Sequence, residues 1–208
     1  MEGSFLDGSA ALGGGLFATD ASGGEHTKDP RLRRCIWAAV HYAWHPDADS
    51  EGHLEVLGTM SGPLPGEQQA VARAELFAVV ALLEHSSAAA TVWTDCQSIW
   101  RRWSKGPQRA AKSRMPGVWR RFWDLLADRE LDEHAGDRRL EWCPSHRTLE
   151  EVHQGVLSHE AWAANNAADE AANAAADRHR LPDHVVKAVE AMDAKIEMVQ
   201  DRLMAINH

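Results

Sequence analysis

The sequence predicts an α/β protein built on a mixed five-stranded sheet, and three observations lead to this fold class. Short apolar runs alternate along the chain with longer segments whose apolar residues recur at helical spacing. Clusters of glycine, proline and charged residues at 21–31, 45–52 and 61–66 separate the first elements, as turns do. Two apolar runs end on an aspartate, Asp20 and Asp95, and the tip of a strand in such a sheet is where sites are built.

The expected elements follow the order βββαβαβα, with an extra helix at the C-terminus. Strands are expected near residues 15–20, 33–43, 53–60, 91–95 and 139–143, and helices near 67–86, 97–104, 115–131, 160–179 and 183–206. Parallel pairing of the first strand with the last two, flanked by an antiparallel pair, would bring Asp20 and Asp95 side by side. The expected domain covers residues 15–180, between a flexible glycine-rich N-terminus at 1–14 and a C-terminal helix at 181–208.

The composition indicates one domain of an intracellular protein, in the cytoplasm or the nucleus. The 208 residues are 44% hydrophobic and 25% charged, which suits a single core of mixed secondary structure. No apolar run approaches the roughly 18 residues that a membrane span needs, and the N-terminus lacks the basic start of a secretory signal. The three cysteines are widely separated, which favours reduced thiols over a disulfide framework or a zinc site.

Four carboxylates in different settings are the candidate site. Asp20 and Asp95 end strands, whereas Glu75 falls inside the apolar arc of its helix, where a lone carboxylate is costly unless something positive meets it. Asp169 lies on an alanine-rich helix, four residues after Asn165, in one polar stripe. Converging acids without a matching Lys or Arg in their own segments suggest a hard divalent cation such as Mg²⁺.

Each acid alone also has a purely structural interpretation. Asp20 and Asp95 could be turn residues or helix N-caps. Glu75 could extend past the edge of its apolar face, and Asp169 could simply be solvated. The order and context of all four acids favour the site.

That order resembles the four acidic motifs of the type 1 ribonuclease H family, which has cellular members and retroviral or retrotransposon members. A fifth stretch is similar to the strand and histidine that precede the last acid in the retroelement members. The resemblance spans roughly residues 15 to 178 and is carried by Phe17-Ala18-Thr19-Asp20-Ala21-Ser22-Gly23-Gly24, Arg73-Ala74-Glu75-Leu76, Thr94-Asp95-Cys96-Gln97-Ser98, Trp142-Cys143-Pro144-Ser145-His146 and Asn165-Asn166-Ala167-Ala168-Asp169.

The resemblance implies a ribonuclease H-like fold and an endonuclease that hydrolyses the RNA strand of RNA/DNA hybrids with two Mg²⁺ ions, for which Mn²⁺ could substitute. It implies that Asp20 bridges both ions. Glu75 and Asp95 would hold the ion nearer the leaving group, and Asp169 the ion on the water side. His146 would be a mobile proton shuttle that assists product release.

The histidine assignment has a competitor. His146 matches the family motif after the last strand, but His159 lies ten residues before Asp169, the separation found in shorter family members. Between His146 and Asp169 this chain carries a longer insert than the cellular enzymes, with His153 inside it.

A basic segment is the second signal, in a chain whose net charge is −9. Eight basic residues and no acid lie between Gln97 and Phe122, with tryptophans among them, which pairs cations for phosphates with flat surfaces for bases or sugars. It resembles the basic protrusion of some ribonucleases H. A solvated helical hairpin with core tryptophans is the structural alternative. The residues expected to contact nucleic acid are Ser22, Gln97, Arg101, Arg102, Trp103, Lys105, Arg109, Lys112 and Asn165.

The chain also departs from the family. Val71 and Ala72 stand where the cellular enzymes carry an asparagine pair, and no hybrid-binding domain is recognisable in residues 1–14. Three alternatives therefore stay open: a non-catalytic ribonuclease H-like interaction module, a module of a retroelement polyprotein, and an integrase- or transposase-like nuclease.

The C-terminal helix carries an apolar stripe that no family motif explains. Its members recur at alternating spacings of three and four, as in a heptad seam: Val189, Met192, Ile196, Val199, Leu203 and Ile206. We expect the stripe to pack back onto the domain, because fewer than three heptads make a weak isolated coiled coil. A weak homodimer through this helix is the alternative.

Overall fold

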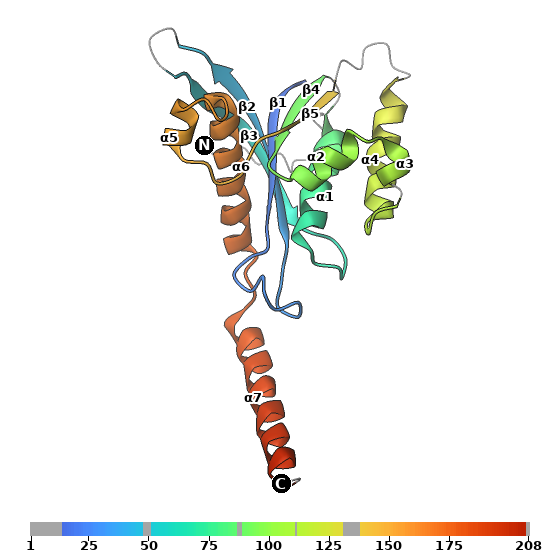
Figure 1. The fold of residues 1–208 in the computed structure, drawn as a ribbon, viewed down its shortest axis with the longest axis vertical. Helices are drawn as coiled ribbons and strands as arrows, with labels where there is room; N and C mark the ends of the chain where they lie inside the picture. Colours follow the sequence, from blue (N-terminus) through green and yellow to red (C-terminus); the bar gives the residue numbers. More distant parts are fainter. Residues whose placement is uncertain (1–13, 48–50, 87–88, 111, 131–137, 207–208) are drawn as a thin grey trace.

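The computed structural model describes residues 14–47, 51–86, 89–110, 112–130 and 138–206, so nearly all of the expected N-terminal segment 1–14 lies outside the described residues. A five-stranded sheet in the order β3-β2-β1-β4-β5 forms its centre (Figure 1). The strands are β1 (Gly15–Ser22), β2 (Ile36–His45), β3 (His53–Pro63), β4 (Ala90–Thr94) and β5 (Arg138–Trp142). The helices are α1 (Val71–His85), α2 (Gln97–Trp103), α3 (Pro107–Ala110), α4 (Pro116–Glu130), α5 (Leu149–His153), α6 (His159–Arg178) and α7 (Asp183–Ile206).

The pairing of the strands confirms the predicted topology. β1 pairs with β2 and β2 with β3 in antiparallel fashion, whereas β1 pairs with β4 and β4 with β5 in parallel. In the β1–β4 register Thr19 lies opposite Thr94. Since Asp20 and Asp95 directly follow these two residues, they come to neighbouring positions at the C-terminal ends of two central strands.

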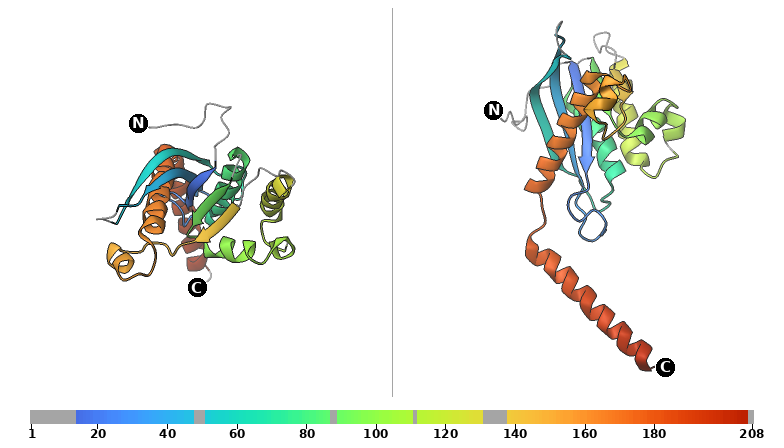
Figure 2. Two further views of the ribbon diagram at one scale, coloured as in Figure 1. Left: turned by 90° about the horizontal axis from the view of Figure 1, so that it is seen from above. Right: turned by 60° about the vertical axis from the view of Figure 1, so that its left-hand side comes forward.

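The two faces of the sheet are covered by different helices (Figure 2). On one face α1 and α4 enclose a core that includes Phe17 and Leu140. On the other face α6 packs on Ala18 through Ala164 and Ala168, which are fully buried. Because strand side chains alternate between faces, neighbouring residues of β1 enter different cores. Alanines on α6 let that helix lie close to the sheet.

The observed elements differ from the expected ones mainly at short helices and one boundary. Helix α1 begins at Val71, later than expected, because the side chain of Gln69 is bonded to the preceding loop: its amide donates to the carbonyl of Gly66 at 2.6 Å and its Oε1 accepts from the amide of Cys35 at 2.8 Å. The short helices α3 and α5 were not predicted. Helix α5 begins with a capping box between Thr148 and Glu151.

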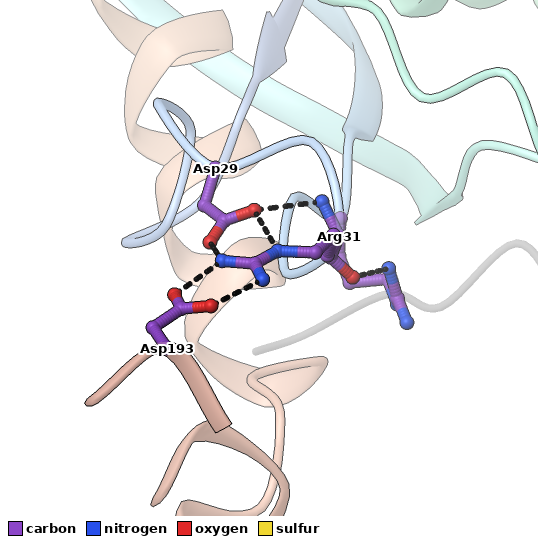
Figure 3. Close-up of polar contacts among 4 residues, drawn as sticks. Asp29, Arg31 and Asp193 are labelled. Carbon is purple, nitrogen blue, oxygen red and sulfur yellow. Dashed lines mark hydrogen bonds and ion pairs between the residues drawn. The ribbon is translucent and has the colours of Figure 1, made fainter. Parts of the chain in front are cut away.

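Helix α7 corrects the expectation that its apolar stripe packs back onto the domain. It extends away from the sheet (Figures 1 and 2), none of its residues is buried, and the stripe is exposed, with Ile196 at 49% and Leu203 at 55%. Arg31, in the β1–β2 loop, links α7 to the domain through Asp193 at 2.6 and 2.7 Å, and also pairs with Asp29 (Figure 3). Since α1, α4 and α6 already cover both faces of the sheet, α7 has no sheet face on which to pack.

Within the described part of the chain, no helix is long and apolar enough to cross a membrane.

Candidate active site

Three of the four predicted acids meet at the end of the central strands. Asp20 lies on β1, Asp95 follows β4 directly, and Glu75 projects from α1, the helix that packs against β1. One carboxylate oxygen from each lies within 4.8 Å of the others. We call Asp20, Glu75 and Asp95 the acidic cluster.

Backbone contacts hold the two aspartates in place. Oδ1 of Asp20 accepts a hydrogen bond from the amide of Ala21 at 2.7 Å. The indole of Trp142, at the end of β5, donates to the carbonyl oxygen of Asp95 at 3.1 Å. The site therefore lies at the ends of three adjacent strands, β1, β4 and β5. A hydrogen-bonded sheet fixes the carboxylates better than mobile loops would.

Burial and mutual repulsion dominate the electrostatics of the acidic cluster. Asp20 and Glu75 are only 7% and 5% exposed. Burial and the charge of Asp95 raise the pKa of Asp20 to about 7, and burial with the charge of Asp20 raises the pKa of Glu75 well above its usual value. Burial also raises the pKa of Asp95, while the nearby charge of His146 opposes that rise. The cluster is therefore costly to ionise without a cation.

The donor set fits a hard divalent cation. Oε2 of Glu75 is buried and has no hydrogen-bond partner among the residues that the structure describes. A buried carboxylate oxygen without a partner is unfavourable in a protein on its own, but it is a normal ligand of Mg²⁺ or Mn²⁺. The residues present thus suit the metal that the sequence predicted, and Asp20, Glu75 and Asp95 are the groups that would hold it.

Asp169 lies near the acidic cluster but is not one of the three carboxylates whose oxygens lie within 4.8 Å of one another. It projects from α6, on the opposite face of the sheet from α1, and is partly buried. Its charge raises the pKa of both Asp20 and Asp95, which places it within electrostatic range of them. A fourth carboxylate at this distance could complete the coordination of a second cation.

The structure separates the two candidate histidines. His146 is exposed in the turn after β5, and its charge lowers the pKa of Asp95. Its backbone has φ of +53°, the one positive value of a residue other than glycine in the described chain. By contrast, Nδ1 of His159 lies 3.1 Å from Glu51, and ten residues of helix place it about 15 Å along α6 from Asp169. His146 thus lies within electrostatic range of Asp95, whereas His159 contacts Glu51.

The basic segment forms a groove next to the acidic cluster. A cavity of about 310 Å³ is lined by Gln97, Ser98, Arg101, Arg102, Lys105 and Arg109, which we call the basic groove. Cys96 separates Asp95 from Gln97 and is the N-cap residue of α2, so the groove begins two residues from the acidic cluster. Lys112 is exposed but does not line this groove. Ser22 is partly buried at the end of β1, where its hydroxyl accepts a hydrogen bond from Gly24.

Two of the residues predicted to contact nucleic acid have packing partners inside the domain. Trp103 packs against the core and lines an apolar crevice with Leu83 and Phe122, because the side of α2 that carries it faces α1 and α4. Asn165 is 7% exposed, and its Oδ1 accepts a hydrogen bond from Sγ of Cys143 at 3.5 Å. The sequence could not reveal this packing, because helical spacing alone does not tell which side of a helix meets the core.

Sequence reasoning also missed two groups. Ser98 lines the basic groove beside Gln97. Its position in the first turn of a helix that directly follows a strand was the sequence signal that could have identified it. The indole of Trp142 was seen only as part of a motif, and no sequence signal shows that it would hold the backbone of Asp95.

Comparisons with known proteins bear on the fold. No family model matches the sequence, and no curated protein matches it significantly. Among solved structures, a foamy viral protease-reverse transcriptase in complex with dsDNA is 19% identical and covers 77% of this chain and 92% of its own, with a TM-score of 0.50. The RNase H domain of prototype foamy virus is 16% identical over 71% of this chain and 90% of its own, with a TM-score of 0.47.

The N-terminal RNase H domain of a Mycobacterium tuberculosis protein is 17% identical, with a TM-score of 0.41, and the match covers 77% of this chain and 98% of that one. The likeness to the first of these structures agrees with the strand order and strand pairing of this chain. The chain has the ribonuclease H-like α/β fold that its five motifs predicted.

Proposed function

We propose that the protein is an endonuclease that hydrolyses the RNA strand of RNA/DNA hybrids with two Mg²⁺ ions. The observation that carries the proposal is the acidic cluster, whose buried carboxylates have raised pKa values and leave Oε2 of Glu75 without a partner. Such a group is costly to keep in a fold unless a cation compensates it.

Each acid has a definite part in this reaction. Asp20, at the centre of the cluster, would contact both ions, with Glu75 and Asp95 on one side and Asp169 on the other. When bound, the two ions would activate the attacking water and stabilise the charge that develops on the leaving 3′ oxygen, and Mn²⁺ could replace Mg²⁺. His146, exposed beside Asp95, would move a proton as the product leaves.

The basic groove is a second observation in favour of a nucleic-acid substrate, because it begins two residues from the acidic cluster. Its four cationic side chains, Arg101, Arg102, Lys105 and Arg109, can neutralise successive phosphates, although the whole chain is acidic. Gln97 lines the groove two residues after Asp95, and its side-chain amide could bond a 2′-hydroxyl and thereby distinguish RNA from DNA.

A cleavage assay tests the proposal. A labelled RNA strand is presented as an RNA/DNA hybrid, as an RNA duplex and as a single strand, with and without Mg²⁺. We expect internal cleavage of the hybrid only, and only with the metal. Hybrid binding without cleavage in Mg²⁺ or Mn²⁺ would contradict the proposal and indicate a non-catalytic interaction module. Cleavage of DNA in place of RNA would indicate an integrase- or transposase-like nuclease.

A further inference from the structure

We propose that Glu51, His153 and His159 form a second metal site, for Zn²⁺ or a similar first-row divalent cation, outside the acidic cluster. We call these three residues the histidine cluster. They come from three separate segments: Glu51 precedes β3, His153 ends α5 and His159 begins α6. The site would therefore join the edge of the sheet to the insert that precedes the last acid.

The geometry brings the right atoms together. Nε2 of His153 lies 2.5 Å from Oε1 of Glu51, and Nδ1 of His159 lies 3.1 Å from Oε2 of the same carboxylate. One ligand atom from each residue lies within 4.8 Å of the others. Ligand atoms around a tetrahedral Zn²⁺ are roughly 3.4 Å apart, as its bond lengths require. Small side-chain rotations would open the cluster to that spacing and leave a fourth position for water.

His159 is held in a fixed orientation. Its ring packs near two indoles, that of Trp44 with centroids 6.4 Å apart and that of Trp162 with centroids 5.4 Å apart. Trp162 is itself anchored, because its Nε1 donates to the carbonyl of Arg147 at 2.8 Å. A ligand whose ring is fixed by its neighbours loses little entropy on binding a metal.

The partners of His159 come from elements that are also fixed. Gly52 has φ of +78°, and an added Cβ there would lie 2.7 Å from the ring of Trp44, so only glycine lets the chain pass this close while carrying Glu51. The short helix with His153 is secured by its capping box and by the buried side chain of Val152. The three ligands are thus positioned by local contacts that do not involve the acidic cluster.

The donor chemistry selects the cation. Two imidazole nitrogens and one carboxylate suit Zn²⁺, as in sites where three protein ligands leave one position open, whereas Mg²⁺ prefers oxygen. Without metal, the same atoms would form an ordinary pair of histidine–glutamate contacts at the surface. Metal binding is the measurement that distinguishes the two.

The test is zinc titration of the full chain, free of any histidine tag, in excess Mg²⁺ so that the acidic cluster does not compete. Isothermal calorimetry should show one Zn²⁺ per chain. His153→Ala and His159→Ala should each weaken binding by at least tenfold to a hundredfold, because losing a ligand costs no less than losing an outer contact of a ligand. Co²⁺ in place of Zn²⁺ should give the visible absorption of a four-coordinate ion.

Two controls make the result decisive. His184→Ala removes an exposed histidine on α7, and Asp95→Asn disables the acidic cluster; both should keep the Zn²⁺ affinity of the original chain. Glu51→Gln, which keeps the size of the side chain, should weaken binding as the histidine variants do, and circular dichroism verifies that each variant is folded. Absence of zinc binding, or equal binding by the His153, His159 and His184 variants, would overturn the proposal.

Discussion

The acidic cluster and the histidine cluster both gather three ligand side chains, but they differ in burial and in donor atoms. The first is mostly buried and offers only oxygen, and Oε2 of Glu75 has no hydrogen-bond partner among the described residues. The second lies near the surface, where Glu51 and His153 are about half exposed, and two of its three donors are imidazole nitrogens. Burial therefore makes ionisation of the acidic cluster costly, whereas two of the three side chains of the histidine cluster remain in contact with solvent.

That difference separates the expected roles. Carboxylates with raised pKa values at the end of a sheet are unfavourable for stability, so a function is the natural reason to keep them. In the histidine cluster, Glu51 already contacts both histidines without a metal. A metal ion there would link three segments of the chain and would not be needed for hydrolysis of the hybrid.

The largest effect is expected from the acids. Asp20→Asn and Asp95→Asn should each reduce hybrid hydrolysis by orders of magnitude, because a neutral amide is a poor ligand for Mg²⁺. Gel quantification of initial rates at saturating Mg²⁺ measures this.

Asp177→Asn is a matched control for the same change at Asp169, since both residues lie on α6 and Asp177 is exposed about two turns further along the helix. Asp169→Asn should lose activity and Asp177→Asn should keep it. Turnover close to that of the original chain in either Asp20→Asn or Asp95→Asn would refute the site.

The histidines give the next largest effect. His146→Ala should lower turnover by about tenfold to a hundredfold, because a positioned proton carrier is lost. His159→Ala should leave turnover in Mg²⁺ nearly unchanged, since this residue belongs to the histidine cluster. Steady-state rates of the two variants decide between them, and a greater loss in His159→Ala would reverse the assignment.

The basic groove should control the salt dependence of binding. Replacing Arg101, Arg102 and Lys105 by Gln should flatten the plot of log affinity against log salt by nearly one unit for each lost phosphate contact. The matched control replaces Lys187, Lys195 and Arg202 on α7, which removes the same charge far from the groove. Fluorescence anisotropy with a labelled hybrid measures both slopes, and equal slopes would show that the groove does not face the substrate.

The stability of the metal-free protein should depend on pH through the acidic cluster. Burial raises the pKa of Asp20 from 3.8 to about 7, so the folded state holds a proton that the unfolded state has released over that interval. Stability from this group is present below the lower value and is lost as the pH rises through the upper one. We expect a lower melting temperature at pH 8 than at pH 5, and Asp20→Asn should flatten that difference. A melting temperature that rises over this interval equally in both proteins would contradict the account.

Some features of the site could be predicted from the sequence and others could not. The ends of β1 and β4 could be predicted because each apolar run stops at an aspartate. Parallel pairing of the two strands then brings Asp20 and Asp95 together. Glu51 could not be linked to His153, because the contact joins segments distant in the chain. The burial of Asn165 and the packing of Trp103 depend on which side of each helix meets the core, and sequence spacing alone left that open.

The smallest effect is expected from α7. Since it buries none of its residues, ending the chain at Arg180 should change the melting temperature by less than about 2 °C. Differential scanning fluorimetry on both lengths measures this, and a large loss of stability would show that the helix packs on the domain in solution. Light scattering on the same samples tests the weak homodimer, which stays a prediction: a mass above that of one chain should appear only when α7 is present.

Anomalous diffraction from crystals soaked in Mn²⁺ tests directly whether the acidic cluster binds metal. Two crystals are compared: the Asp95→Asn variant with the hybrid bound, and the original chain alone. The account predicts Mn²⁺ among Asp20, Glu75 and Asp95 in the original chain, with two peaks roughly 4 Å apart at full occupancy. In the variant, which keeps Asp20 and Glu75, the peaks should weaken or disappear. Crystals of a chain that cleaves hybrid in solution but show no Mn²⁺ among these carboxylates would contradict the account.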